Sequence, residues 1–116
     1  MEAGTARQLA YALERGNDDH SAILVLEEDG RRQGFVWVKM LDDFYGGPPM
    51  GKISEIAVTE SGKGSGRQLM SAAEEWAKKR GARLMLLNAL ETNASGRRFY
   101  SLQGYEPEYT AYVKRL

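Results

Sequence analysis

The feature that most constrains this chain is a glycine-rich segment, SGKGSG, which joins an apolar run to an amphipathic stretch. The run is Ile53–Val58, and after the segment apolar side chains recur at helical spacing, at Leu69, Ala72, Ala73 and Trp76. Because glycine has no Cβ, successive backbone N–H groups can turn toward one point and approach a ligand closely. The helix that follows adds its unpaired N–H groups and the positive end of its dipole. This order of strand, loop and helix predicts a cradle for a pyrophosphate.

Two other nucleotide motifs fit the sequence poorly. The glycines of the segment are spaced G-x-G-x-G, whereas the dinucleotide fingerprint is G-x-G-x-x-G, and Arg67 stands in place of its last glycine. Upstream, residues 46–52 (GGPPMGK) have the spacing of a nucleotide P-loop. There Ile53 replaces the Ser or Thr that would hold magnesium, and a strand follows where a helix is required. We therefore expect neither a dinucleotide fold nor a P-loop.

Composition and charge exclude several classes of protein. A chain of 116 residues is expected to form one domain, residues 1–116. Sixteen Lys and Arg balance sixteen Asp and Glu, which leaves no basic excess for binding nucleic acid. No Cys and a single His argue against a metal site, and no apolar run reaches the about 18 residues of a membrane span. Because no secretory signal is recognised either, we expect a cytoplasmic protein without metal, nucleic-acid or membrane partners.

Turn residues and periodicity divide the chain into secondary-structure elements. Residues 5–15 are expected to form a short helix, and Asp29-Gly30 is a hairpin signal between the apolar runs 22–26 and 35–40. A helix capped by Thr92 or Asn93 is expected to end near Gln103. The strands expected in the second half span residues 53–58, 84–90 and 105–116.

These elements predict an α/β fold. Strands and helices alternate in the second half after an antiparallel first half, which indicates a mixed sheet with helices on both faces. Residues 84–90 are nearly all apolar, so we expect their strand to be central in the sheet.

Two separated motifs make the sequence resemble the GNAT N-acetyltransferase family. The first combines EIAV, the loop SGKGSG and the helix GRQLMSAAEEWAKK, and is similar to the family's pyrophosphate loop Q/R-x-x-G-x-G/A. The second is NASGRRFYSLQGY, in which Asn93, Tyr100, Gly104 and Tyr105 fall on the family's spacing, with Tyr105 in place of Phe. The likeness covers residues 22–116 and implies a GNAT-like acyl-CoA N-acyltransferase fold.

The resemblance implies that acetyl-CoA is the co-substrate. In the family, two strands diverge, and the pantetheine lies between them and pairs with the exposed edge of the strand before the loop. Asn93 is expected to bond the cofactor, and a plain helix cap is its alternative role. Carried over to this chain, the residues that would bind acetyl-CoA are Ile56, Ala57, Val58, Ser61, Gly62, Lys63, Gly64, Ser65, Gly66, Arg67, Asn93 and Tyr100.

The resemblance also implies direct transfer of the acetyl group to a primary amine of a small molecule or peptide, with no covalent enzyme intermediate. Tyr100 matches the family's general acid, since a phenol is a neutral proton donor at pH 7; its alternative is packing on the sheet. Glu55 is the candidate base, because burial in an otherwise apolar strand would favour proton uptake. An exposed charge on a strand face is the alternative for Glu55, and a water relay could replace a dedicated base.

The sequence departs from the family pattern at the loop and at its start. Ser61 stands where Arg or Gln is favoured, and the stretch from Val58 to the loop is two residues shorter than usual. The chain before Ala22 is short, so the first strand of the family is expected to be missing. A bare sheet edge invites pairing, so we expect a homodimer partner or a rearranged N-terminus to cover it. The shortened start favours an alternative function, a non-catalytic acyl-CoA-binding sensor or regulatory module of the same fold.

Overall fold

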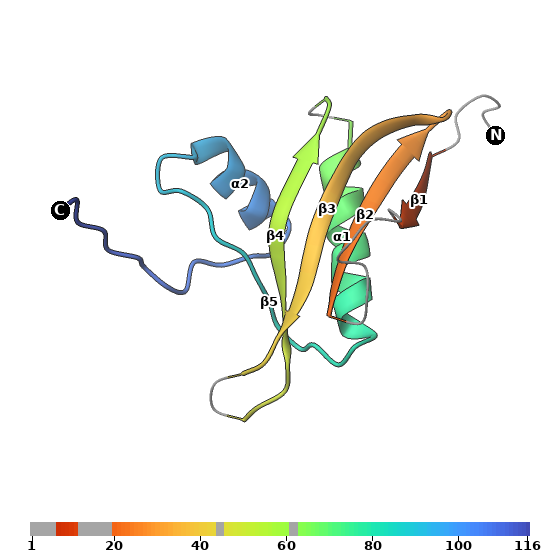
Figure 1. The fold of residues 1–116 in the computed structure, drawn as a ribbon. Coiled ribbons are helices and arrows are strands. Elements are labelled where there is room, and N and C mark those ends of the chain that lie inside the picture. Colours follow the sequence, from red (N-terminus) through yellow and green to blue (C-terminus); the bar gives the residue numbers. More distant parts are fainter. Residues whose placement is uncertain (1–6, 12–19, 44–45, 61–62) are drawn as a thin grey trace.

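The computed structural model describes residues 7–11, 20–43, 46–60 and 63–116. Its core is one five-stranded mixed sheet in the order β1-β2-β3-β4-β5, in which β1 to β4 are antiparallel neighbours and β5 is parallel to β4 (Figure 1). The elements in chain order are β1 (Arg7–Tyr11), β2 (Ser21–Glu28), β3 (Arg31–Leu41), β4 (Met50–Val58), α1 (Ser65–Lys78), β5 (Met85–Leu86) and α2 (Ala94–Leu102).

The hairpin of β2 and β3 forms as the sequence predicts. Asp29 has a φ of 52° and Gly30 a φ of 78°, so both turn residues are left-handed, as a tight hairpin turn of this kind requires. The strands are in register from Ser21↔Lys39 to Glu28↔Arg31, with an irregularity after Leu26.

The core lies between one face of the sheet and α1. Alternate residues of the strands point at the helix, which explains why the residues that β2 and β3 contribute to this core are two apart. The apolar stripe predicted for α1 supplies the other half of this core. The buried residues of the whole core, from the strands and the helix together, are Ala22, Leu24, Leu26, Val36, Val38, Ile53, Leu69, Met70, Ala73, Trp76, Ala77 and Ala82.

The start of the chain differs from the prediction. Arg7–Tyr11 is a strand that pairs with β2 from Arg7↔Glu28 to Tyr11↔Leu24, so the helix expected over residues 5–15 is wrong there, and the first strand is present. Residues 5–6 and 12–15 lie outside the described part of the chain. A short isolated helix is marginal, whereas the edge of β2 offers a full row of backbone hydrogen bonds. The edge expected to be bare is therefore covered by the chain itself.

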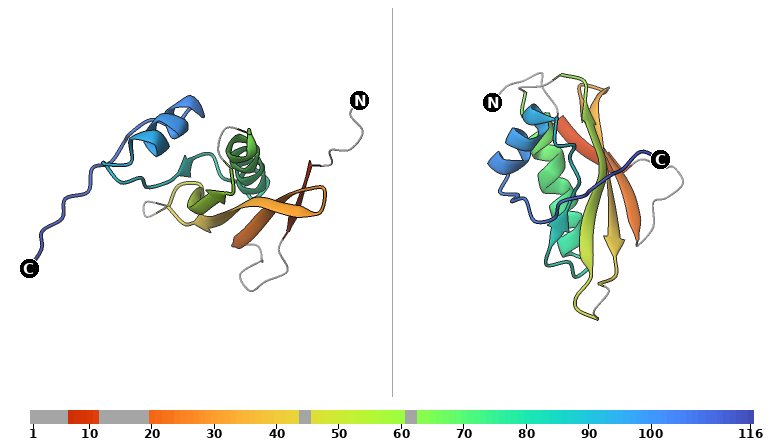
Figure 2. Two further views of the ribbon diagram at one scale, coloured as in Figure 1. Left: turned by 90° about the horizontal axis from the view of Figure 1, so that it is seen from above. Right: turned by 90° about the vertical axis from the view of Figure 1, so that its left-hand side faces the viewer.

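The second half also corrects three predictions. The strand expected over residues 84–90 is reduced to Met85–Leu86 and lies at the edge of the sheet, and residues 105–116 contain no strand. The predicted second helix is confirmed as α2. Both described helices lie on one side of the sheet, where helices on both faces were expected (Figure 2). Neither has the length and apolarity needed to cross a membrane.

Candidate functional site

The central feature of the candidate site is an unpaired edge of β4. Along one side β4 pairs with β3 over its whole length, but β5 meets it only at Gly51↔Met85 and Lys52↔Leu86. From Ile53 to Val58 the other edge has no strand partner among the described residues, because the chain after β5 diverges toward α2 (Figure 1). This edge presents a row of backbone N–H and C=O groups that an extended ligand can pair with.

The N-terminus of α1 lies just past the end of β4 and is open. Gly64 is its N-cap residue, with a φ of 81°, and no side chain caps the first turn, which also contains no acidic residue. A Cβ on Gly64 would meet nothing within 4 Å. The N–H groups and the positive dipole end are therefore free of a side-chain cap, which suits an anion. Ser61 and Gly62, predicted to take part, lie outside the described residues.

Two cations flank this helix terminus. The Lys63 ammonium lies 3.2 Å from the Glu60 carboxylate, and both side chains are exposed. Arg67 is exposed in the first turn and has no ion-pair partner among the described residues. Exposed pairs of the Lys63–Glu60 kind are weak, so an arriving anion can compete with Glu60 for the Lys63 ammonium.

The second helix contacts the first close to this terminus. A Cβ on Gly66 would lie 3.1 Å from Cζ of Phe99, so the small residue in α1 lets the ring of α2 approach. The adjacent Tyr100 is half-buried and meets Phe99 edge-on, with ring centroids 5.5 Å apart. No hydrogen bond to its phenol is found within the described part of the chain. Packing of Phe99 on Gly66 thus brings α2, which carries Tyr100, to the cradle end of α1.

Asn93 caps α2. Its Oδ1 accepts a hydrogen bond from the Gly96 N–H at 3.1 Å, which satisfies one of the free donors of the first turn. Of the two roles left open for Asn93, the cap is therefore observed. The side-chain NH₂ group remains able to contact a ligand.

Glu55 is exposed, so the burial expected for the candidate base is wrong. A bulge in the pairing of β3 and β4 is the cause: Ile53 lies opposite Val38, but Glu55 lies opposite Trp37. In a regular strand, Glu55 would lie on the same buried face as Ile53. The bulge adds one residue to β4 between them, so the Glu55 side chain lies on the face away from α1. The helix α2, which carries Tyr100, lies on the same side of the sheet as α1 (Figure 2). Glu55 and Tyr100 therefore do not lie on the same face of the sheet.

A hydrogen bond that the sequence did not reveal ties the end of α2 to α1. The Tyr105 hydroxyl donates to Oε2 of Glu74 at 2.8 Å. Burial, with the hydrogen bond to Glu74 and its negative charge, raises the pKa of Tyr105 above its usual range. The sequence did carry a signal for this hydrogen bond, because Tyr105 stands where the family has Phe. A half-buried phenol usually has a hydrogen-bond partner.

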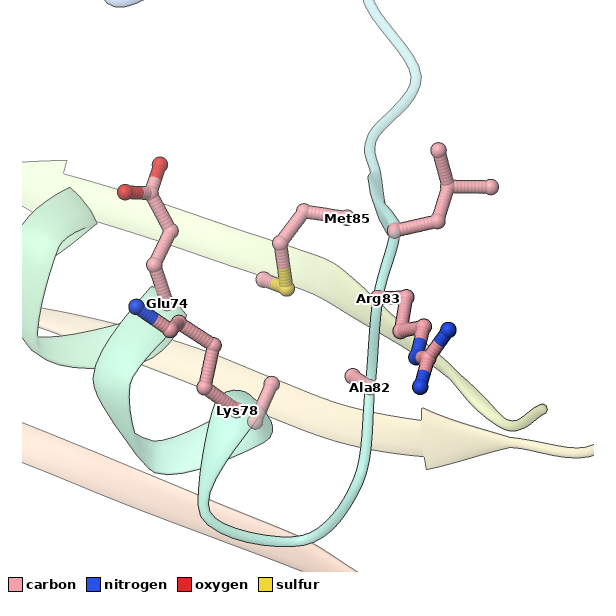
Figure 3. Close-up of a pocket in the computed structure, with 7 residues that line it drawn as sticks. Glu74, Lys78, Ala82, Arg83 and Met85 are labelled. Carbon is pink, nitrogen blue, oxygen red and sulfur yellow. The ribbon is translucent and has the colours of Figure 1, made fainter.

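Two hollows lie beside the sheet, one of them next to the free end of β4. One, of about 390 Å³, lies between the second half of α1 and β5 and is lined by Glu74, Ala77, Lys78, Ala82, Arg83, Leu84 and Met85 (Figure 3). The other, of about 450 Å³, is a groove lined by Ile23, Val25 and Phe35 and also by Ala57 and Val58 at the end of β4. Neither is lined by Gly64 or Tyr100. Within the described ranges no group of three or more His, Asp or Glu side chains could hold a metal ion.

Comparison with known proteins gives a family match. Residues 2–105 match the model of the acetyltransferase (GNAT) family. The ribosomal-protein-alanine N-acetyltransferase from Brucella melitensis biovar Abortus 2308 is 26% identical, with a TM-score of 0.70 over 86% of this chain and 76% of that one. The aminoglycoside N-acetyltransferase AAC(6')-Iy, solved with CoA, is 22% identical, with a TM-score of 0.77 over 86% of this chain and 69% of that one.

The fold also occurs in a protein described as a transcriptional regulator. This protein, from Bacillus halodurans C-125, is 23% identical, with a TM-score of 0.76 over 86% of this chain and 69% of that one. No curated protein matches the chain.

Proposed function

Because the chain belongs to the acetyltransferase (GNAT) family, we propose that it transfers an acetyl group from acetyl-CoA to a primary amine of a small molecule or peptide. The observation that supports this function best is the unpaired edge of β4, which ends beside the uncapped N-terminus of α1. Tyr100 is held close to that terminus through its neighbour Phe99. One extended ligand with a pyrophosphate at one end fits this arrangement.

The chain's own groups divide the binding of acetyl-CoA between them. The first N–H groups of α1, with Lys63 and Arg67, would hold the pyrophosphate. The backbone of Ile56, Ala57 and Val58 would pair with the pantetheine amides, as an added strand does. A structural neighbour solved with CoA has the same fold, which supports this assignment.

Direct attack requires two proton transfers at two different atoms. The amine nitrogen attacks the thioester carbon, the C–N bond forms and the C–S bond breaks. A backbone N–H of β4 would stabilise the charge that develops on the carbonyl oxygen. Tyr100 would give its proton to the departing sulfur, and the proton lost by the amine would go to Glu55 or to water. Because the acid and the base serve different atoms, their placement on different faces of the sheet is compatible with this route.

The first experiment tests the cradle by calorimetry with CoA. Gly64→Glu places a side chain and a negative charge in it, and we expect the affinity for CoA to fall at least tenfold, or about 1.4 kcal/mol. Gly46→Glu is the matched control, because Gly46 also has a positive φ, 78°, and open space around its Cβ position, but lies in the turn before β4. Equal effects of the two substitutions would refute the location of the cradle.

The second experiment tests the acid. Tyr100→Phe keeps the ring that packs on Phe99 and removes only the proton, so we expect kcat to fall by about 10²–10⁴ with little change in the affinity for CoA. The rate is followed as free CoA thiol released in the presence of a panel of amines. If kcat is unchanged, Tyr100 is not the acid.

A non-catalytic acyl-CoA-binding module is the second candidate function. The exposed position of Glu55 favours this module, because an exposed carboxylate lacks the burial that would favour proton uptake by a base. The same assays separate the two functions: CoA binding without thiol release on any amine supports the module, whereas absence of CoA binding excludes both.

A further inference from the structure

The sheet face away from α1 carries a pair of lysines. Val38 and Ile53 lie opposite each other in β3 and β4 and point into the core under α1. Their neighbours Lys39 and Lys52, called here the lysine pair, also lie opposite each other and therefore point to the other face. Both described helices lie on the α1 side of the sheet, so neither of them covers the lysine pair (Figure 2).

The lysine pair has no ion-pair partner within the described part of the chain. No carboxylate among those residues forms a salt bridge with Lys39 or Lys52. Two like charges directly opposite each other across a strand pair destabilise the sheet. An anion between the two ammonium groups would remove this repulsion and would accept charge-assisted hydrogen bonds from both. The lysine pair is therefore suited to bind an anionic group.

Trp37 holds one member of the lysine pair in place. The indole N–H of Trp37 donates a hydrogen bond to the Ser21 hydroxyl at 2.9 Å, which orients the ring. The Lys39 ammonium lies over this ring, 4.6 Å from its centroid, in a cation–π contact. The ammonium is therefore positioned before a ligand binds, which lowers the loss of side-chain entropy on binding.

Glu55 lies close to the lysine pair. It is opposite Trp37, which is two residues from Lys39 in β3, so the row of Glu55 and the lysine pair are about 7 Å apart. In the other direction, Phe35 and Ala57 lie opposite each other and line the groove of about 450 Å³. The surface beside Glu55 is thus hollowed on one side and positively charged on the other.

We propose that the lysine pair selects the acceptor, by binding the carboxylate or phosphate of a primary amine whose nitrogen lies at Glu55, about 7 Å away. This selection rests on acetyl transfer as the proposed function and names the class of its acceptor, an anionic amine. The ammonium form of the acceptor is attracted to Glu55, and its anionic group to the lysine pair. A polyamine is disfavoured, because its second ammonium group would face two lysines.

Four para-substituted amines of similar shape test the selection. At the end far from the amine, para-(aminomethyl)benzoate and para-(aminomethyl)phenyl phosphate are anionic, para-methylbenzylamine is neutral and para-xylylenediamine is cationic. The rate is followed as free CoA thiol released. We expect kcat/KM to be at least about tenfold higher for one anionic amine than for the neutral amine, which is the effect of one hydrogen bond to a charged group, and lowest for the diamine. The faster of the two anionic amines identifies the anion.

The outcomes of this assay separate the selection from acetyl transfer itself. The selection is wrong, and acetyl transfer stands, if the neutral amine reacts as fast as both anionic amines. Absence of thiol release with every amine tested overturns both.

Substitutions locate the selection on the lysine pair. Lys52→Gln removes one charge at nearly constant length, so the ratio of kcat/KM for the anionic amine to that for the neutral amine should fall about tenfold, mainly through KM. Arg31→Gln is the matched control, because it removes one exposed cation at the far end of β3, and it should leave the ratio unchanged. The affinity of both variants for CoA, measured by calorimetry, should match that of the unmodified protein. The proposal is wrong if the two variants change the ratio equally, or if Lys39→Gln/Lys52→Gln keeps the preference for the anionic amine.

Discussion

The close approach of Gly34 to its neighbours allows a prediction of defined size. Gly34 lies in β3 opposite Val58, next to the free end of β4. A Cβ at this position would lie 2.5 Å from the Ala57 carbonyl oxygen, 3.1 Å from Cα of Val58 and 3.1 Å from Cδ1 of Leu69. Two of these three atoms belong to the backbone of β4 and cannot rotate away, so Gly34→Ala must push the strand.

The expected loss of stability follows from two opposing terms. Overpacking of this kind costs about 1–3 kcal/mol. Alanine has less conformational entropy than glycine in the unfolded chain, which raises the free energy of unfolding by about 0.4–1 kcal/mol. We therefore expect a net loss of about 1–2 kcal/mol. For 116 residues the entropy of unfolding near 60 °C is about 0.24 kcal/mol/K, so the Tm should fall by about 4–8 °C.

Thermal unfolding followed by circular dichroism measures this effect. Gly47→Ala is the control, since the three atoms nearest to its Cβ position belong to the Asp43 side chain, which, unlike a strand backbone, can rotate. Rotation of Asp43 would break the hydrogen bond from the Gly47 N–H to Oδ2 of Asp43, whereas the backbone of β4 would not be displaced. A Tm of Gly34→Ala equal to or above that of the unmodified protein would refute the argument that the β4 backbone leaves no room. Because the displaced strand carries Ala57 and Val58, the same variant should also weaken CoA binding.

Two further predictions concern α2 and its attachment. Tyr105 has a raised pKa in the folded chain, so its stabilising contribution is present below about pH 10 and is lost as the pH rises toward the raised value. The difference in free energy of unfolding between the unmodified protein and Tyr105→Phe should therefore shrink above about pH 10, by at most about 1.4 kcal/mol per pH unit. The decrease should be smaller than this limit because the ring is only half-buried. Urea midpoints of both proteins between pH 8 and 11 measure this difference, and a constant difference would contradict it. Asn93→Ala should lower the free energy of unfolding, measured with urea, by about 1 kcal/mol because the helix cap is lost. Asn93→Ser keeps a capping oxygen and should lose less. Equal losses in the two variants would show that the cap contributes nothing.

The features that the sequence predicted correctly depend on residues close together in the chain. The turn at Asp29-Gly30 follows from two residues that tolerate a positive φ. The helix after the glycine-rich segment follows from apolar residues three and four apart, and α2 follows from the cap at Asn93. The two motifs that carry the family resemblance are also local patterns, and the match over residues 2–105 confirms the family.

Contacts between residues far apart in the chain decided the rest. Arg7–Tyr11 is a strand because the edge of β2 is available to it, and no local pattern records that edge. Glu55 is exposed because one extra residue in the pairing of β3 and β4 reverses the faces of the strand beyond it. Gly66 receives the Phe99 ring, and Tyr105 finds Glu74, only after the helices pack. Local periodicity and turn chemistry thus determined which segments become helices and hairpins, whereas strand pairing and packing determined which side chains meet, because those contacts join residues that the sequence holds apart.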